Sequence, residues 1–181
     1  MIKNIYKTVV LGLFFFAFLL FSTFLTNCLA SDEIKLSNGQ TVYVSIYSNV
    51  FSGWGTKPFI YSNVRKRGKK PFEYQLAAML SIRNTDIHNS IRIISADYFD
   101  NDGKLLKKYI DRPLVLIPLG SNYIYIERDD KTGGFGANFI VQWESTKEVN
   151  VPIIEGIMIG FSSHGGVSLL GPGQVIKENT K

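Results

Sequence analysis

The sequence predicts an all-β fold, a single β-sandwich of the immunoglobulin-like kind, preceded by an N-terminal hydrophobic export helix. Three observations support this prediction. Short β-branched and aromatic runs recur at intervals of about ten residues. Turn-forming Gly, Asn, Asp and Pro separate them, and no stretch after the N-terminal segment has apolar residues at helical spacing. The length of 181 residues is that of one domain.

The N-terminal segment has the three parts of a secretory signal: a positively charged start, an uncharged apolar run and a small-residue exit. Cleavage after Ala30 fits the small residues at the exit. Lipidation of Cys28 also fits, because Leu25 precedes it by three residues as in a bacterial lipobox, although Asn27 stands where that motif prefers Gly, Ala or Ser. Retention as a membrane anchor fits as well, since residues 8–26 would span about 28 Å as a helix.

All three fates place the domain outside the cytoplasm, in the periplasm or cell envelope, and two of them attach it to the membrane. We expect residues 1–30 to be this signal or anchor, 31–39 a short polar linker, 40–176 the folded domain and 177–181 a polar tail. Cys28 is the only cysteine, so the domain itself can form neither a disulfide nor a thiolate metal site. The formal net charge of +5 is too small to indicate a class of partner.

Within the domain, residues 40–47 alternate between apolar and polar or aromatic side chains, which is typical of a strand. Residues 48–71 have no periodicity and are interpreted as a long loop. Asp100 to Gly103 separates two apolar runs and predicts a hairpin turn, because glycine accepts a positive φ. The chain after Gly173 is polar and is expected to fray. The other expected strands are 72–83, 91–99, 105–110, 113–118, 122–127, 137–144, 152–161 and 166–170.

The long loop contains the two most conspicuous features of the sequence, a cluster of cations and a tryptophan between two glycines. The cations are Arg65, Lys66, Arg67, Lys69 and Lys70. Together with Trp54 they predict a binding surface for an anionic lipid or an anionic cell-envelope polymer. A nucleic acid would also attract this charge, but the compartment argues against it. The alternatives are a solvated loop and a Trp54 side chain that folds over the core.

Glu155 stands in an apolar run whose two faces are both apolar, which predicts a central strand. A carboxylate there needs a cationic or hydrogen-bonded partner. Arg83 ends another apolar run, and we predict that it contacts Glu155 as a buried pair or as part of a site.

Other motifs lack the residues that their chemistry requires. The turn at Asp100 to Gly103 has no further calcium ligands at the necessary spacing. The glycine run at 133–136 lacks the third glycine of a nucleotide loop. His88 and His164 belong to no catalytic or metal-binding motif. We therefore predict no catalytic residue, no metal site and no cofactor.

Several blocks of the sequence, in order, resemble DUF3124, a bacterial family of unknown function. The blocks are Gly39 to Val44, Leu80 to Asp86, Asp97 to Asp100 with Asp102 to Leu105, Gly133 to Phe139, and Glu155 to Gly160. The resemblance implies an envelope protein with an all-β domain and implies no activity. The cationic cluster and Trp54 lie outside these blocks.

The leading function is that of a non-catalytic envelope protein that binds a protein partner, a membrane surface or an anionic polymer. The first alternative is an envelope enzyme, of the hydrolase type, with a site built from polar residues in the family-like blocks. Those residues are Arg83, Asn84, Asp86, Asn138 and Glu155. The second alternative is a structural module that associates through exposed sheet edges.

Overall fold

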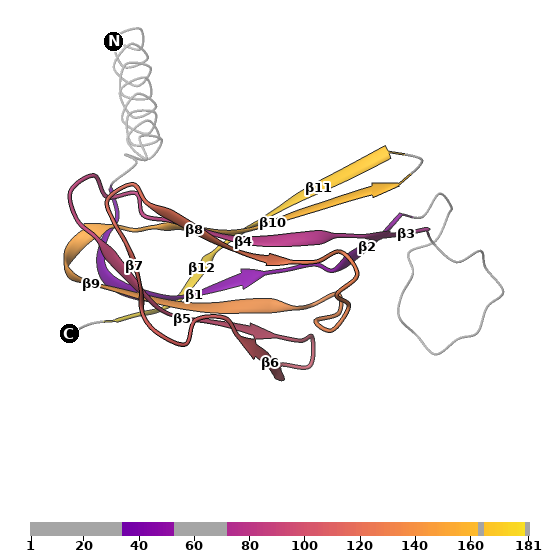
Figure 1. Cartoon of the computed structure of the whole chain (residues 1–181), viewed down its shortest axis with the longest axis horizontal. Helices are drawn as coiled ribbons and strands as arrows, with labels where there is room; N and C mark the ends of the chain where they lie inside the picture. Colours follow the sequence, from indigo (N-terminus) through magenta and orange to yellow (C-terminus); the bar gives the residue numbers. More distant parts are fainter. Residues whose placement is uncertain (1–33, 53–71, 163–164, 180–181) are drawn as a thin grey trace, which may run out of the picture. The chain divides into compact units, whose positions relative to one another are not determined.

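The computed structural model describes residues 34–52, 72–162 and 165–179, and in this part the protein consists of strands and connecting turns without a helix (Figure 1). No segment of it therefore has a helix long and apolar enough to cross a membrane. The strands are β1 (Leu36–Ser45), β2 (Asn49–Ser52), β3 (Phe72–Gln75), β4 (Ala77–Arg83), β5 (Ile91–Phe99), β6 (Leu105–Lys108), β7 (Leu114–Leu116), β8 (Ser121–Ile126), β9 (Asn138–Asn150), β10 (Ile153–Ser162), β11 (Gly165–Pro172) and β12 (Gln174–Glu178). The all-β prediction is confirmed.

The strands form antiparallel sheets. A six-stranded sheet has the order β12-β1-β9-β5-β6, with β7 also paired to β5, and a four-stranded sheet has the order β11-β10-β4-β8. A two-stranded sheet joins β2 and β3. The chain passes from the four-stranded to the six-stranded sheet at Gly173, where β11 ends and β12 begins.

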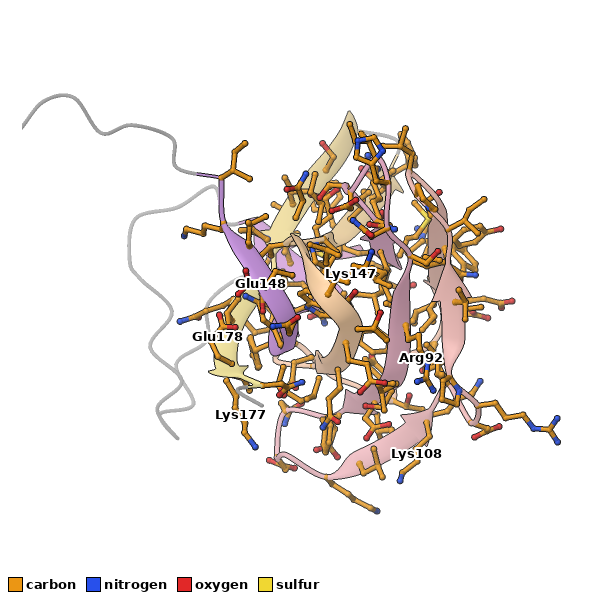
Figure 2. The ribbon with its side chains drawn as sticks, turned by 90° about the vertical axis from the view of Figure 1, so that its left-hand side faces the viewer. Arg92, Lys108, Lys147, Glu148, Lys177 and Glu178 are labelled. Carbon is orange, nitrogen blue, oxygen red and sulfur yellow. The ribbon has the colours of Figure 1, made fainter. Side chains whose placement is uncertain are left out.

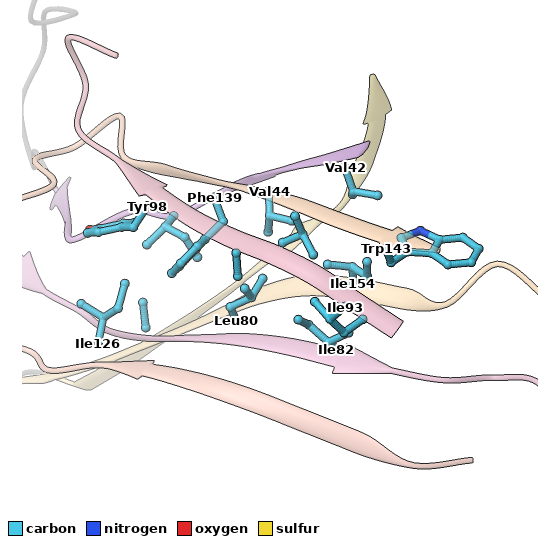
Figure 3. Close-up of a cluster of buried hydrophobic side chains, with 14 of the residues drawn as sticks. Val42, Val44, Leu80, Ile82, Ile93, Tyr98, Ile126, Phe139, Trp143 and Ile154 are labelled. Atoms are coloured by element: carbon cyan, nitrogen blue, oxygen red, sulfur yellow. The ribbon is translucent and has the colours of Figure 1, made fainter. Parts of the chain in front are cut away.

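The two larger sheets enclose one hydrophobic core. Figure 3 shows Val44, Phe139 and Trp143 of the six-stranded sheet on one side of this core, with Leu80, Ile82 and Ile154 of the four-stranded sheet on the other. These side chains are almost completely buried. Their alternation along each strand is what places them on the inner face, because successive side chains of a strand point to opposite sides.

Two glycines allow the sheets to approach closely where β1 ends. A Cβ added to Gly156 on β10 would lie 2.8 Å from the carbonyl oxygen of Ser45, and one added to Gly171 on β11 would lie 2.7 Å from the same oxygen. Both distances are shorter than a carbon–oxygen contact permits. Gly156 and Gly171 are partners in the β10–β11 pair, so glycine is required at both positions for the backbone of Ser45 to lie this close above them.

The structure corrects three boundaries. Asn49–Ser52 was expected in a loop, but it forms β2 by pairing with β3 across residues that lie outside the described part. Gln174–Glu178 was expected to fray, but it forms β12 because β1 offers it an unpaired edge. The expected strand over 72–83 is divided at Leu76 into β3 and β4. The predicted hairpin at Asp100 to Gly103 is confirmed, since β5 and β6 pair antiparallel across it.

Candidate functional site

The two larger sheets carry very different amounts of charge. The four strands of the four-stranded sheet contain two charged residues, Arg83 and Glu155. The strands of the six-stranded sheet contain many more, and Figure 2 shows several of them around that sheet. They are Arg92, Asp97, Lys107, Lys108, Glu144, Lys147, Glu148, Lys177 and Glu178.

The outer side of the four-stranded sheet carries a row of apolar side chains that crosses all four strands. The register places Tyr125 beside Met79, Met79 beside Ile157, and Ile157 beside Leu170. Residues directly opposite in neighbouring strands share a face. Because the next residues in β10 and β8, Met158 and Ile126, are buried in the core, this row must point outward.

More apolar side chains extend the row along the strands. Tyr123 is 65% exposed, Phe161 66% and Leu170 61%, and Ile153 and Ile159 are also exposed. We call this surface the apolar face and define it by Met79, Tyr123, Tyr125, Ile153, Ile157, Ile159, Phe161 and Leu170. Contiguous apolar surface of this kind on a soluble domain marks an interaction site more often than scattered single residues do.

A shallow hollow of 530 Å³ lies at one end of the apolar face. Its polar lining includes Ser81, Arg83, Ser121 and Asn122. Its apolar lining includes four residues, of which three belong to the apolar face: Met79, Tyr123, Ile153 and Leu119. The hollow therefore combines one cation, several neutral hydrogen-bonding groups and an apolar wall.

Arg83 and Glu155 form an ion pair at this end of the sheet. Nη2 of Arg83 lies 3.8 Å from Oε1 of Glu155, and the Arg83 Nε–H donates to Oγ of Ser81 at 3.1 Å. The side chain of Arg83 is 52% exposed and that of Glu155 is 18% exposed. The predicted partners thus lie within ion-pair distance, but the guanidinium is half exposed rather than buried. A pair this open to solvent contributes at most about 1 kcal/mol to stability.

Leu119 forms the rim of the hollow in an unusual backbone conformation. Its φ is 59°, which L-residues other than glycine rarely adopt, and its side chain is exposed. The turn is held by two hydrogen bonds, from the Leu119 N–H to the Asp86 carbonyl and from the Gly120 N–H to the Ile117 carbonyl. Such a conformation costs about 1–3 kcal/mol, so neighbouring contacts must maintain it.

The side chains of Asn84 and Asp86 connect the loops beside the hollow by hydrogen bonds. The Asn84 amide nitrogen donates to the carbonyl oxygens of Asn89, Leu116 and Ile117. Oδ1 of Asp86 accepts from the backbone N–H groups of His88 at 2.8 Å and Asn89 at 2.7 Å, and Oδ2 accepts from the Asn150 N–H at 3.2 Å. The Asp86 N–H also donates to Oδ1 of Asn84 at 3.0 Å, so every polar atom of both side chains has a partner.

The same hydrogen bonds determine the acidity of Asp86. The donors from His88 and Asn89 stabilise the carboxylate more than desolvation destabilises it, and they lower the pKa of Asp86 from 3.8 to about 2. Asp86 is therefore ionised at neutral pH and serves as a fixed acceptor. Among the described residues, the hydrogen-bond donors to its oxygens are the backbone N–H groups of His88, Asn89 and Asn150 and the side-chain amide of Asn89, and none of these is a nucleophile.

The five polar residues suggested for an enzyme do not gather at one place. Arg83, Asn84, Asp86 and Glu155 lie at the same end of the domain, near the turn from β9 to β10. Asn138 begins β9, whereas Asn150 at the other end of that strand contacts Asp86. These two ends pair with Ser45 and Leu36 of β1, so about 30 Å separates them. Among the described residues, no group of three His, Cys, Asp or Glu is placed to hold a metal ion.

Other predicted features fall outside the described residues. These are Trp54, the cations Arg65, Lys66, Arg67, Lys69 and Lys70, the lipidation candidate Cys28, and His164. The apolar face itself was not anticipated. The sequence indicated that β10 is apolar on both sides, and β10 is indeed internal to its sheet, but the pattern could not indicate that outer side chains such as Ile159 and Phe161 are exposed. The shortage of charge in β4, β8, β10 and β11 was the available signal.

Comparisons with known proteins identify a family that matches most of the domain. A family model described as "Protein of unknown function (DUF3124)" matches residues 39–176. A search of curated proteins found no match. A solved structure from Thermotoga maritima, titled "Crystal Structure of Thermotoga maritima 1070", is 12% identical, covers 77% of this chain and 97% of its own, and has a TM-score of 0.40.

Proposed function

The chain belongs to the DUF3124 family of proteins of unknown function, and we propose that it is an exported, non-catalytic envelope protein that binds a protein partner through the apolar face. The observation that supports this proposal is the row of Tyr125, Met79, Ile157 and Leu170 across a sheet face that no other described strand covers. Protein interfaces are depleted of charge at their centre and enriched in aromatic residues and Met. The apolar face has this composition, and the hollow around Arg83 supplies polar groups at its border.

The membrane is a less suitable partner for this surface. An open sheet that entered lipid would carry the unpaired backbone groups of its edge strands, β8 and β11, into a region without water. Arg83 and Glu155 have opposite charges, so the sheet has no net charge with which to attract anionic lipids. Both arguments favour a protein as the occupant.

Site-specific photo-crosslinking in intact cells tests the proposal. A photoreactive residue at Tyr125 or Leu170 should form adducts that a charge at Ile157 abolishes, because Ile157→Lys places an ammonium in the centre of the apolar row. The control position is Gln142, which is exposed on the outer side of β9. Equal adducts from the apolar face and from Gln142, or none from the apolar face, would contradict the proposal.

The extracytoplasmic location is a second part of the proposal. It is supported by the charged start, the apolar run and the small-residue exit of residues 1–30. The intact mass of the protein from membrane and soluble fractions distinguishes the three fates. A mass of residues 28–181 plus acyl chains indicates a lipoprotein, one of residues 31–181 indicates cleavage, and the full mass in the membrane fraction indicates an anchor. Recovery of the full-length chain from the cytoplasm would contradict export.

We further propose that the two sheets form an immunoglobulin-like sandwich. Its support is the pair of antiparallel sheets around one core that includes the buried Trp143. Because the domain has no cysteine, this sandwich would lack the disulfide that joins the sheets of antibody domains. An experimental structure without Greek-key strand connections would reject it.

The cationic cluster supports a second binding activity, toward an anionic envelope polymer or lipid headgroup. Its support is the presence of five cations between Arg65 and Lys70. Replacing all five by glutamine should weaken retention on anionic envelope material at low salt, with less difference at high salt. Unchanged retention at low salt would remove this activity.

A further inference from the structure

We infer that the protein partner of the apolar face is a second copy of the same chain, which packs its own apolar face on the first. This inference rests on the proposed function, because it requires the apolar face to be an interface. It identifies the occupant from the area, the shape and the charges of the face itself.

The area of the face agrees with what a reversible dimer needs. Four strands spaced by about 4.8 Å and about seven residues long form a patch of about 500 Å². Two such patches bury about 1,000 Å², which is the lower limit for a specific interface. Sheets that stack face to face lie about 10 Å apart, close enough for Tyr and Leu side chains from the two copies to interdigitate.

The face is self-complementary under a two-fold rotation. The two internal strands of the sheet are β4 and β10, and the two edge strands are β8 and β11. A two-fold axis parallel to the strands and midway between β4 and β10 exchanges the internal strands with each other and the edge strands with each other. It places Met79 over Ile157 of the second copy and Tyr125 over Leu170 of the second copy, so that apolar side chains face each other across the axis.

The same axis brings opposite charges together. Arg83 on β4 comes over the segment of β10 that contains Ile153 and Glu155 in the second copy. Each Arg83 can then interact with the Glu155 of both copies, in a site that the dimer shields from water. Arg83 and Glu155 are the charged residues of β4, β8, β10 and β11, so the interface that these strands form contains no unpaired charge. An interface with the charged six-stranded sheet of another copy would bury several unpaired charges.

Sedimentation of the protein in the form that cells export, measured over a range of concentrations, tests the dimer. We expect a reversible monomer–dimer equilibrium. Ile157→Lys and Leu170→Lys should each raise the dissociation constant by about tenfold or more. Gln142→Lys, on the outer side of β9, should leave it unchanged. The Leu170 side chain is 61% exposed, so Leu170→Lys remains informative if Ile157→Lys fails to fold.

A pair of charge reversals separates contacts between copies from contacts within one copy. Arg83→Glu gives each chain two carboxylates at this place, and Glu155→Arg gives each chain two cations. Either variant alone should dimerise less than the wild type, whereas an equimolar mixture should form heterodimers. A merely intramolecular role of the pair would not produce association in the mixture.

The outcomes distinguish this inference from the function on which it rests. A wild-type protein that stays monomeric at every concentration, while Tyr125 still crosslinks to a different protein in cells, overturns the dimer and leaves the binding function intact. A monomer whose apolar face crosslinks to nothing overturns both. A dimer that Gln142→Lys disrupts and Leu170→Lys does not would also reject this interface.

Discussion

The hydroxyl group of Tyr98 lies directly against Gly133, where a side chain on residue 133 would overlap it. Tyr98 is buried on the inner side of β5, and its ring packs on that of Phe139 with 4.9 Å between the centroids. Its hydroxyl has no hydrogen-bond partner within the described part of the chain. Glycine at position 133 is therefore required for the packing of Tyr98.

Replacing Tyr98 by phenylalanine is expected to preserve or increase stability. The substitution removes a buried hydroxyl that makes no hydrogen bond and keeps the ring contact with Phe139. Eliminating an unsatisfied polar group can stabilise a protein by about 1 kcal/mol. Urea unfolding measures the difference. A loss of more than about 1 kcal/mol would indicate that the hydroxyl is bonded in solution.

The substitution Gly133→Ala is expected to destabilise the domain by about 1–3 kcal/mol, the usual cost of overpacking. The added methyl group would lie 2.6 Å from Cβ of Ala137 and would overlap the Tyr98 hydroxyl. Thermal unfolding of Gly133→Ala and of its combination with Tyr98→Phe provides the check. The second substitution should recover part of the loss, and independent, additive effects would refute this contact as the cause.

Alkaline unfolding should depend on Tyr98. Burial, and to a smaller extent the charge of Asp130, raises the pKa of Tyr98 from 10.0 to about 12. A raised folded-state pKa means that the stabilisation is complete below pH 10 and is lost as the pH rises toward 12. Tyr98→Phe should shift the alkaline unfolding midpoint upward, as followed by circular dichroism. Tyr123→Phe, at an exposed position, is the control and should leave the midpoint in place.

Acid unfolding should depend on Asp86. Its pKa falls from 3.8 to about 2 in the folded protein, so its contribution is complete above pH 3.8 and disappears as the pH falls toward 2. Asp86→Asn should therefore lower stability at neutral pH, and its difference from the wild type should shrink over this interval. Asp102→Asn, in the exposed turn between β5 and β6, is the matched control. A difference that stays constant from pH 7 to pH 2 would show that the charge of Asp86 is not involved.

Local signals in the sequence predicted most of the strands, and long-range pairing explains the exceptions. The turn at Asp100 to Gly103 is determined by residues within the turn, where Asp100 accepts hydrogen bonds from the N–H groups of Asp102 and Lys104. The strand at Gln174–Glu178 has no such local determinant. It forms because β1, far away in sequence, presents an edge with which it pairs.

The candidate site was predictable only in part, for a related reason. A carboxylate within an apolar run indicated that Glu155 needs a partner, and Arg83 was the candidate because it ends another apolar run. The apolar face depends on which side of β10 the other sheet covers, and alternation alone cannot determine this when both sides are apolar. Similarly, the loop roles of Asn84 and Asp86 depend on carbonyl and N–H groups from distant turns.

The pairing of β1 with β12 has a consequence for the order of events during synthesis. β12, at residues 174–178, pairs with β1 at the edge of the six-stranded sheet. This sheet is therefore incomplete until the ribosome has made these residues. Contacts between residues so far apart in the sequence form late and slow the folding of the domain. If the chain is exported as proposed, this late pairing would leave β1 with an unpaired edge until almost the whole chain has been made.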